Sequence, residues 1–93
     1  MNRYEMLYVL KSEITDEAKD AVIAKFENLV VENGGVVEST EKWGTKKLAY
    51  PINYKNDGYF VLMTFAAPTT MVAELKRVAW IQDEVIRRMI TKL

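Results

Sequence analysis

The residue types that proteins use most often for catalysis are missing from this sequence. Its 93 residues include no histidine and no cysteine, which excludes the commonest general base, a cysteine nucleophile, a disulfide and a thiolate metal site. No Walker-type glycine loop or Gly-x-Gly-x-x-Gly motif occurs. Glu5, Glu38 and Glu41 could approach one another across strands, but a catalytic carboxylate needs burial and a matched partner. We therefore expect no enzyme, no metal site and no cofactor.

The chemistry that remains is that of charge. Basic and acidic residues balance at 13 each, and a net charge of zero at first argues against a nucleic-acid partner. Residues 1–40, however, hold four basic and eight acidic residues, whereas residues 41–93 hold nine and five. A protein that is neutral overall can still present one basic face to phosphate. The alternative is a solvated surface of mixed sign, which is the default for soluble proteins.

Length and hydropathy indicate one domain that spans residues 1–93. A chain of this size buries only about 60% of its unfolded surface, and 49% hydrophobic residues suffice for one compact core. No run approaches the ~20 apolar residues of a membrane span, and the first residues lead directly into a strand pattern, so we expect no membrane contact and no signal peptide. The absence of cysteine also fits a reducing cytosol.

The first half of the chain predicts a strand, a helix and a second strand. Residues 4–10 contain several aromatic and β-branched residues, and apolar residues on both sides of the alternation after Glu5 favour a central strand. Thr15 is expected to cap a helix that ends at residues 33–35, Asn-Gly-Gly. Residues 36–43 form a second strand that is polar enough to lie at a sheet edge.

A bend and a turn are expected before the third strand. Gly44 should interrupt the second strand as a bulge or a bend, and residues 46–52 can continue it. Residues 56–58, Asn-Asp-Gly, predict a hairpin turn. The strand that follows, residues 59–66, is the most hydrophobic and should be central.

The second helix should begin at residues 68–70 and end at residues 82–83, before a last strand over residues 85–93. Simple alternation divides that strand into two sides. One side is Val85, Arg87, Met89, Thr91 and Leu93. The other is Ile86, Arg88, Ile90 and Lys92.

The order βαββαβ is that of the α+β ferredoxin-like fold. Right-handed crossovers place both helices on one face of a four-stranded antiparallel sheet. The first and third strands then lie in the middle, with the second and fourth at the edges. The open face of the sheet, or an edge, is where a partner would bind. The fold by itself does not decide the function.

The same order of elements also occurs in the RNA-recognition motif, whose third strand carries a basic residue, glycine and spaced aromatic residues. Residues 58–61, Gly-Tyr-Phe-Val, match part of that pattern, but Asp57 stands where a basic residue is expected. Tyr59 and Phe60 point in opposite directions, so at most one could stack on a base from the open face. Packing of both rings in the core is the alternative.

Residues 44–52, Gly-Thr-Lys-Lys-Leu-Ala-Tyr-Pro-Ile, resemble the signature of the bacterial ribosomal protein S-six family of the small (30S) subunit, in which a basic pair precedes Leu-Ala-Tyr-Pro-Ile. Three further stretches agree in order: residues 3–5, 58–60 and 83–88. The resemblance spans residues 2–93. Many members carry a longer C-terminal tail than this sequence, so contacts of that tail are not carried over.

The resemblance implies a structural component of the cytoplasmic ribosome. Members of the family pair with ribosomal protein S-eighteen, and together the two bind the central domain of the small-subunit ribosomal RNA during assembly. A near-neutral chain makes few phosphate contacts and should bind RNA weakly alone, because each contact contributes roughly −0.9 to the salt slope on duplex. A basic partner could supply the missing charge.

Two groups of contact residues follow. Lysine and arginine suit phosphate and carboxylate, and arginine can bind either through two hydrogen bonds; the candidates for RNA contacts are Arg3, Lys46, Lys47, Arg87 and Arg88. By resemblance, the polar edge faces the protein partner through Glu41, Lys42 and Trp43, although a charged edge also deters edge-to-edge pairing. Three residues alternate toward one face and are expected in the core: Leu48, Tyr50 and Ile52.

Overall fold

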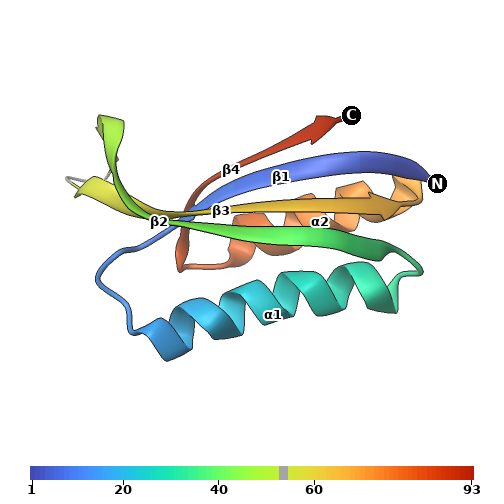
Figure 1. The fold of residues 1–93 in the computed structure, drawn as a ribbon, viewed down its shortest axis with the longest axis horizontal. Coiled ribbons are helices and arrows are strands. Elements are labelled where there is room, and N and C mark those ends of the chain that lie inside the picture. Colours follow the sequence, from blue (N-terminus) through green and yellow to red (C-terminus); the bar gives the residue numbers. More distant parts are fainter. Residues whose placement is uncertain (53–54) are drawn as a thin grey trace.

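The computed structural model describes residues 1–52 and 55–93, with side chains described for residues 1–47 and 57–93. The elements are β1 (Asn2–Leu10), α1 (Asp16–Glu32), β2 (Val36–Ile52), β3 (Lys55–Ala67), α2 (Thr69–Ile81) and β4 (Val85–Lys92). The strands form one antiparallel sheet in the order β2-β3-β1-β4. Both helices cover the same face of it (Figure 1). This arrangement confirms the predicted ferredoxin-like fold, with β1 and β3 in the middle.

The core lies between the sheet and the helices. On β1, Met6, Tyr8 and Leu10 face the helices and are fully buried. They pack with apolar residues of β3 and with Phe26 of α1 and Leu75 of α2. Each such side chain stabilises the fold by roughly 1.5–3 kcal/mol through removal of apolar surface from water. The 2-residue alternation of the central strands therefore fixes which face carries the helices.

Helix α1 begins and ends as the sequence predicts. The Thr15 side-chain oxygen Oγ1 accepts a hydrogen bond of 3.1 Å from the backbone N–H of Ala18, which satisfies one of the free donors of the first turn. Asn33 is the C-cap, and Gly34 follows with a φ of 84°. Glycine adopts that left-handed conformation without the steric penalty of a Cβ atom.

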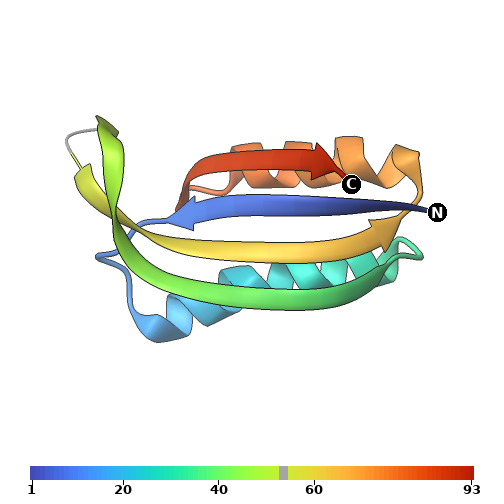
Figure 2. The same cartoon turned by 45° about the horizontal axis from the view of Figure 1, so that its top comes forward.

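Strands β2 and β3 form a long hairpin that extends past the rest of the sheet and curves away from the helices (Figures 1 and 2). We call the described part of it over residues 44–52 and 55–58 the arm. The pairing register shifts between Lys42 and Gly44, and Gly44 has a φ of 86°, which confirms the predicted bulge. The predicted core positions of Leu48, Tyr50 and Ile52 lie outside the described side chains.

The hairpin turn predicted at residues 56–58 is wrong. Asp57 and Gly58 lie within β3 and pair with Lys47 and Lys46. The glycine serves packing instead of a turn, because a Cβ atom at Gly58 would lie 2.2 Å from Cγ1 of Val9 on β1. A glycine inside a strand is a known sign of such a close approach.

The predicted division of β4 into two sides is also wrong at its first residue. Val85 pairs with Leu10, but Arg87 pairs with Val9, so the register shifts at Ile86. A bulge of this kind reverses the alternation beyond it. Val85 therefore shares the helix side with Arg88, while Arg87 lies on the open face. No helix in the described part of the chain has the length and apolar character needed to cross a membrane.

Candidate nucleic-acid interface

The sheet face opposite the helices has an apolar centre. The register places Leu7 of β1 between Leu62 of β3 and Met89 of β4. One step along, Val9 lies beside Phe60 and is only 2% exposed, whereas Met89 is 55% exposed. These residues form an apolar strip across three strands, on the sheet face that neither helix covers (Figure 2). A strip of this kind suits contact with a partner.

Two of the five predicted RNA-contact residues, Lys46 and Arg87, lie on this open face at the arm end. Arg87 pairs with Val9, and Val9 pairs with Phe60, which in turn opposes Gly44. Lys46 lies one step further along the open side of β2, opposite Gly58. Three strand spacings separate β2 from β4, or roughly 14 Å. Lys46 and Arg87 are both exposed and mark the two edges of the apolar strip at the arm end.

Arg3 lies at the other end of the same face. It pairs with Ala66, six residues along β1 from Val9, which corresponds to about 20 Å. Its guanidinium donates three hydrogen bonds to Glu38, of which the shortest are Nε to Oε2 at 2.9 Å and Nη2 to Oε1 at 2.8 Å. These hydrogen bonds lower the pKa of the Glu38 carboxyl. The charge of Arg3 is therefore compensated locally, and the structure separates it from Lys46 and Arg87.

Lys47 and Arg88 face the opposite way. Lys47 pairs with Asp57, whose Oδ1 accepts a 2.8 Å hydrogen bond from the Ser12 hydroxyl in the loop before α1. Arg88 pairs with Tyr8 on the helix side, and its guanidinium carbon lies 4.2 Å from the centre of the Trp80 ring. The five cations thus form no single patch. Lys46, Lys47 and Arg87 gather near the arm on both sides of the sheet.

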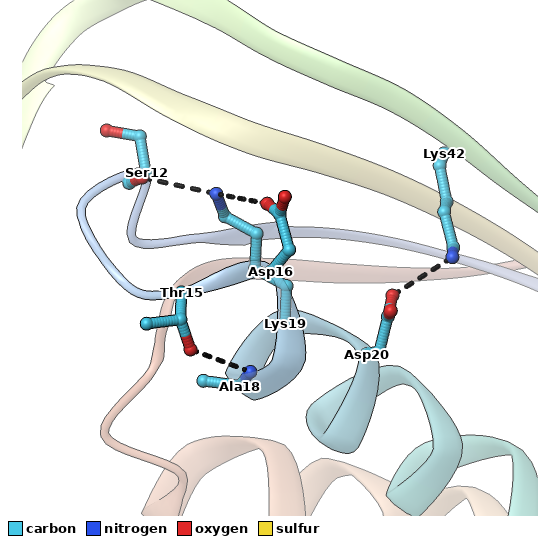
Figure 3. A network of polar contacts seen from close by, with 7 residues as sticks. All are labelled: Ser12, Thr15, Asp16, Ala18, Lys19, Asp20 and Lys42. Atoms are coloured by element: carbon cyan, nitrogen blue, oxygen red, sulfur yellow. Dashed lines mark hydrogen bonds and ion pairs between the residues drawn. The ribbon is translucent and has the colours of Figure 1, made fainter.

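The three predicted partner-contact residues also separate. Glu41 opposes Leu62 on the open face and is exposed. Trp43 is 43% exposed, and the Lys46 ammonium lies 5.0 Å from its ring centre. Lys42 instead turns toward α1, where its Nζ donates to Asp20 Oδ1 at 3.0 Å (Figure 3). That hydrogen bond raises the pKa of Lys42. Glu41 and Trp43 remain available at the β2 edge.

A buried lysine that sequence reasoning missed anchors the root of the arm. Lys19 is buried in α1, donates to the Ser12 carbonyl at 3.2 Å, and lies 3.7 Å from Asp16 (Figure 3). Its ammonium also lies 4.9 Å from the centre of the Tyr59 ring. The sequence does contain a signal for this burial. Lys19 lies three residues before Val22 and seven before Phe26, so it falls on the same helix face as these buried residues.

These contacts fix the arm relative to the helices. Ser12 is held both by Lys19 through its carbonyl and to Asp57 through its hydroxyl. The loop before α1 therefore ties α1 to the strand that carries one side of the arm. Because the arm is anchored at its root, Lys46 and Lys47 project from a defined position, as a binding site requires.

Comparison with known proteins identifies the family. The family model for "Ribosomal protein S6" matches residues 3–92. Curated relatives named small ribosomal subunit protein bS6 include that of Clostridium novyi, 44% identical over 97% of this chain and 95% of the relative. The protein from Exiguobacterium sp. (strain ATCC BAA-1283 / AT1b) is 40% identical over 99% of this chain and 97% of the relative.

The fold comparison agrees with the family match. The crystal structure of 30S ribosomal protein S6 from Thermotoga maritima superposes with a TM-score of 0.94, covering 99% of this chain and 87% of that one, at 20% identity. This likeness supports the fold alone, whereas the sequence relatives are structural, non-enzymatic proteins of the ribosome. The chain therefore belongs to the ribosomal protein S6 family, whose members are components of the small subunit of the cytoplasmic ribosome.

Proposed function

We propose that this protein binds ribosomal protein S-eighteen and the central domain of the small-subunit ribosomal RNA together, through the open sheet face and the arm. The observation that supports this proposal best is the grouping of uncompensated cations beside an apolar strip. No ion pair among the described residues involves Lys46, Lys47 or Arg87. RNA phosphates supply the charge that this end of the molecule lacks.

The apolar strip and the β2 edge suit the protein partner. Leu7, Leu62 and Met89 offer apolar area, and Glu41 and Trp43 offer a carboxylate and a large ring at the adjoining edge. Interfaces commonly combine an apolar centre with a polar rim and aromatic anchors. A basic partner seated here would pair with Glu41 and add positive charge beside Lys46. Arg3, already bound to Glu38, should contribute less to RNA binding than the arm.

The first experiment measures co-binding of the chain and its partner to central-domain RNA. Lys46→Glu with Lys47→Glu should keep the fold and weaken co-binding at least about tenfold, because charge-assisted hydrogen bonds contribute roughly 1.5–3 kcal/mol each. Lys25→Glu, an exposed lysine of α1, is the control for a lysine-to-glutamate change on the helix layer. Filter binding that shows unchanged affinity for the arm variant would remove these lysines from the site.

The second experiment separates this proposal from a free-standing RNA-recognition-motif binder. On the open face Phe60 is half-buried beside Val9, while Tyr59 faces the helices and contacts Lys19. One ring is thus available where that motif uses two or three. The isolated protein should bind central-domain RNA poorly and gain affinity when the partner is added. Tight binding without the partner would favour the alternative.

A further inference from the structure

A second aromatic and basic cluster lies on the helix side of the sheet, between α2 and β4. A cavity of about 210 Å³ opens there, lined by Lys76, Ala79, Trp80, Arg88 and Ile90. Trp80 is 74% exposed, although burial of a ring this large would otherwise contribute strongly to stability. Neither the open face nor the arm includes this cluster.

The ring of Trp80 is oriented by a cation from the neighbouring strand. The Arg88 guanidinium carbon lies 4.2 Å from the ring centre, which is a cation–π contact. Arg88 is itself fixed by the pairing of β4 with β1, opposite Tyr8. Because the guanidinium stacks on Trp80 and most of the side chain stays exposed, the ring is a pre-oriented stacking surface.

Two basic side chains, Lys76 and Arg88, line the cavity together with this ring. Neither Lys76 nor Arg88 forms an ion pair with any residue in the described ranges. Of the carboxylates close in sequence, Glu74 pairs with Arg77, and Glu84 accepts hydrogen bonds from the uncharged Gln82 amide. An anionic ligand therefore meets two cations without a described carboxylate partner, beside an exposed indole.

We propose that Trp80, Arg88 and Lys76 form a binding site for an unpaired nucleobase of single-stranded RNA. The base stacks on the indole, and its flanking phosphates bind Arg88 and Lys76. Single-stranded nucleic acid is bound by this combination of an aromatic ring and cations. An acidic peptide would use the cations but not the ring. The inference rests on the proposed function only in that the protein contacts RNA.

The first test uses Trp80 as its own reporter. The chain has two tryptophans, so Trp43→Phe leaves Trp80 as the only one. Titration with an adenosine RNA octamer at low salt should quench its emission saturably, because stacking brings the base against the indole. Polyphosphate and polyglutamate should compete for the cations without quenching to the same extent. Equal quenching by polyglutamate would assign the cluster to an acidic peptide and overturn the proposal.

The second test measures affinity with a fluorescein-labelled octamer by anisotropy. Trp80→Ala should weaken binding about tenfold, the scale of one base–aromatic stack, and Trp80→Phe should restore most of the loss. Because Trp80 is exposed, thermal unfolding of both variants should match the parent. Equal octamer affinity of the Trp80→Ala variant and the parent overturns the inference.

A third variant keeps this inference distinct from the proposed function. Lys46→Glu should leave the Trp80 quenching by the octamer unchanged while it weakens co-binding with the protein partner. If Lys46→Glu has no effect on co-binding but Trp80→Ala still weakens octamer binding, the arm proposal fails and this site stands. If Lys46→Glu abolishes the Trp80 quenching, the cluster does not bind RNA independently and the inference fails.

Discussion

Two tyrosines on β1 face the same core and differ in whether the hydroxyl has a partner. The Tyr4 hydroxyl accepts a hydrogen bond from the Asn2 amide and donates to Thr69. The Tyr8 hydroxyl is buried and has no hydrogen-bond partner among the described residues. A buried polar group without a partner loses its hydration and gains nothing in return. The single oxygen of Tyr8 therefore opposes folding, while its ring packs edge-on against Phe26.

Removal of that oxygen should stabilise the protein. Tyr8→Phe keeps the ring and should raise the free energy of unfolding by about 1 kcal/mol, measured by urea denaturation. Tyr4→Phe is the matched control and should lower it by up to about 1 kcal/mol, because it removes a hydroxyl that is hydrogen-bonded. A loss of stability in Tyr8→Phe as large as that in Tyr4→Phe would contradict the assignment.

The same hydroxyl predicts how stability responds to alkaline pH. Burial raises the pKa of Tyr8 above its ordinary value, which is about 10 in the unfolded chain. As pH rises above about 10, the unfolded chain releases this proton while the folded protein retains it, so stability falls. The fall should be shallower in Tyr8→Phe, and unfolding midpoints compared between pH 8 and about 11 measure the difference. Parallel curves for the two proteins would exclude Tyr8 as a contributor.

Among the elements, the β2–β3 arm depends on two glycines that serve different purposes. A Cβ atom at Gly44 would meet nothing within 4 Å, so this position needs glycine only for its φ of 86°. At Gly58 the backbone conformation is ordinary, but the Cβ atom would collide with Val9. The first glycine sets the direction of the arm, and the second lets β1 approach its root.

Alanine at each glycine should therefore have different consequences. Gly44→Ala should cost roughly 1–2 kcal/mol of stability through left-handed strain, and Gly44→Asn less, because asparagine tolerates that conformation. Gly58→Ala should cost roughly 1–3 kcal/mol through overpacking. Val9→Ala should relieve the second cost but not the first, so a double-mutant cycle in urea identifies the clash. If the stability losses of Gly58→Ala and Val9→Ala were simply additive, contact with Val9 would not be the cause of the cost at position 58.

The sequence predicts every element of this fold, but not how two of them pair. Periodicity and the cap at Thr15 depend on neighbours in sequence, so they can be read locally. The requirement for glycine at position 58 comes from Val9, which is distant in sequence. The local pattern Asn-Asp-Gly therefore wrongly predicts a turn at residues 56–58. The bulge at Ile86 is likewise set by the pairing of β4 with β1, and one extra residue there moves Arg87 to the open face.

At the scale of the whole molecule, a net charge of zero conceals a division between compensated and free cations. Arg3, Lys42 and Arg77 each bind a carboxylate. Lys46, Lys47 and Arg87 near the arm, and Lys76 and Arg88 at the α2–β4 cavity, pair with none of the described carboxylates. The sequence could supply the list of cations but not this division, because each ion pair joins residues on different strands or helices, or depends on a side-chain rotamer.

This division predicts the salt dependence of RNA binding. For co-binding with the partner, Lys46→Gln and Arg87→Gln should each reduce the slope of log affinity against log salt by about 0.9, the value for one phosphate contact on duplex. Arg3→Gln should change the slope much less, because Glu38 already compensates that charge. Filter binding over a salt series measures all three. If Arg3→Gln reduced the salt slope as much as Lys46→Gln, RNA would have to displace Glu38 from Arg3, and the prediction would be wrong.

The strand order β2-β3-β1-β4 also determines when the core can close. Strand β1 is synthesised first, yet its neighbours are β3 and β4, and Tyr4 pairs with Lys92 near the far end of the chain. Only the β2–β3 pairing joins strands that are consecutive in the chain, so the nascent chain can form it early, while β1 waits for its partners. Long-range pairing of this kind is slow, because loop closure precedes the contacts that reward it. Until β4 has been synthesised, the edge of β1 that β4 will pair with presents unpaired backbone groups to chaperones and other chains.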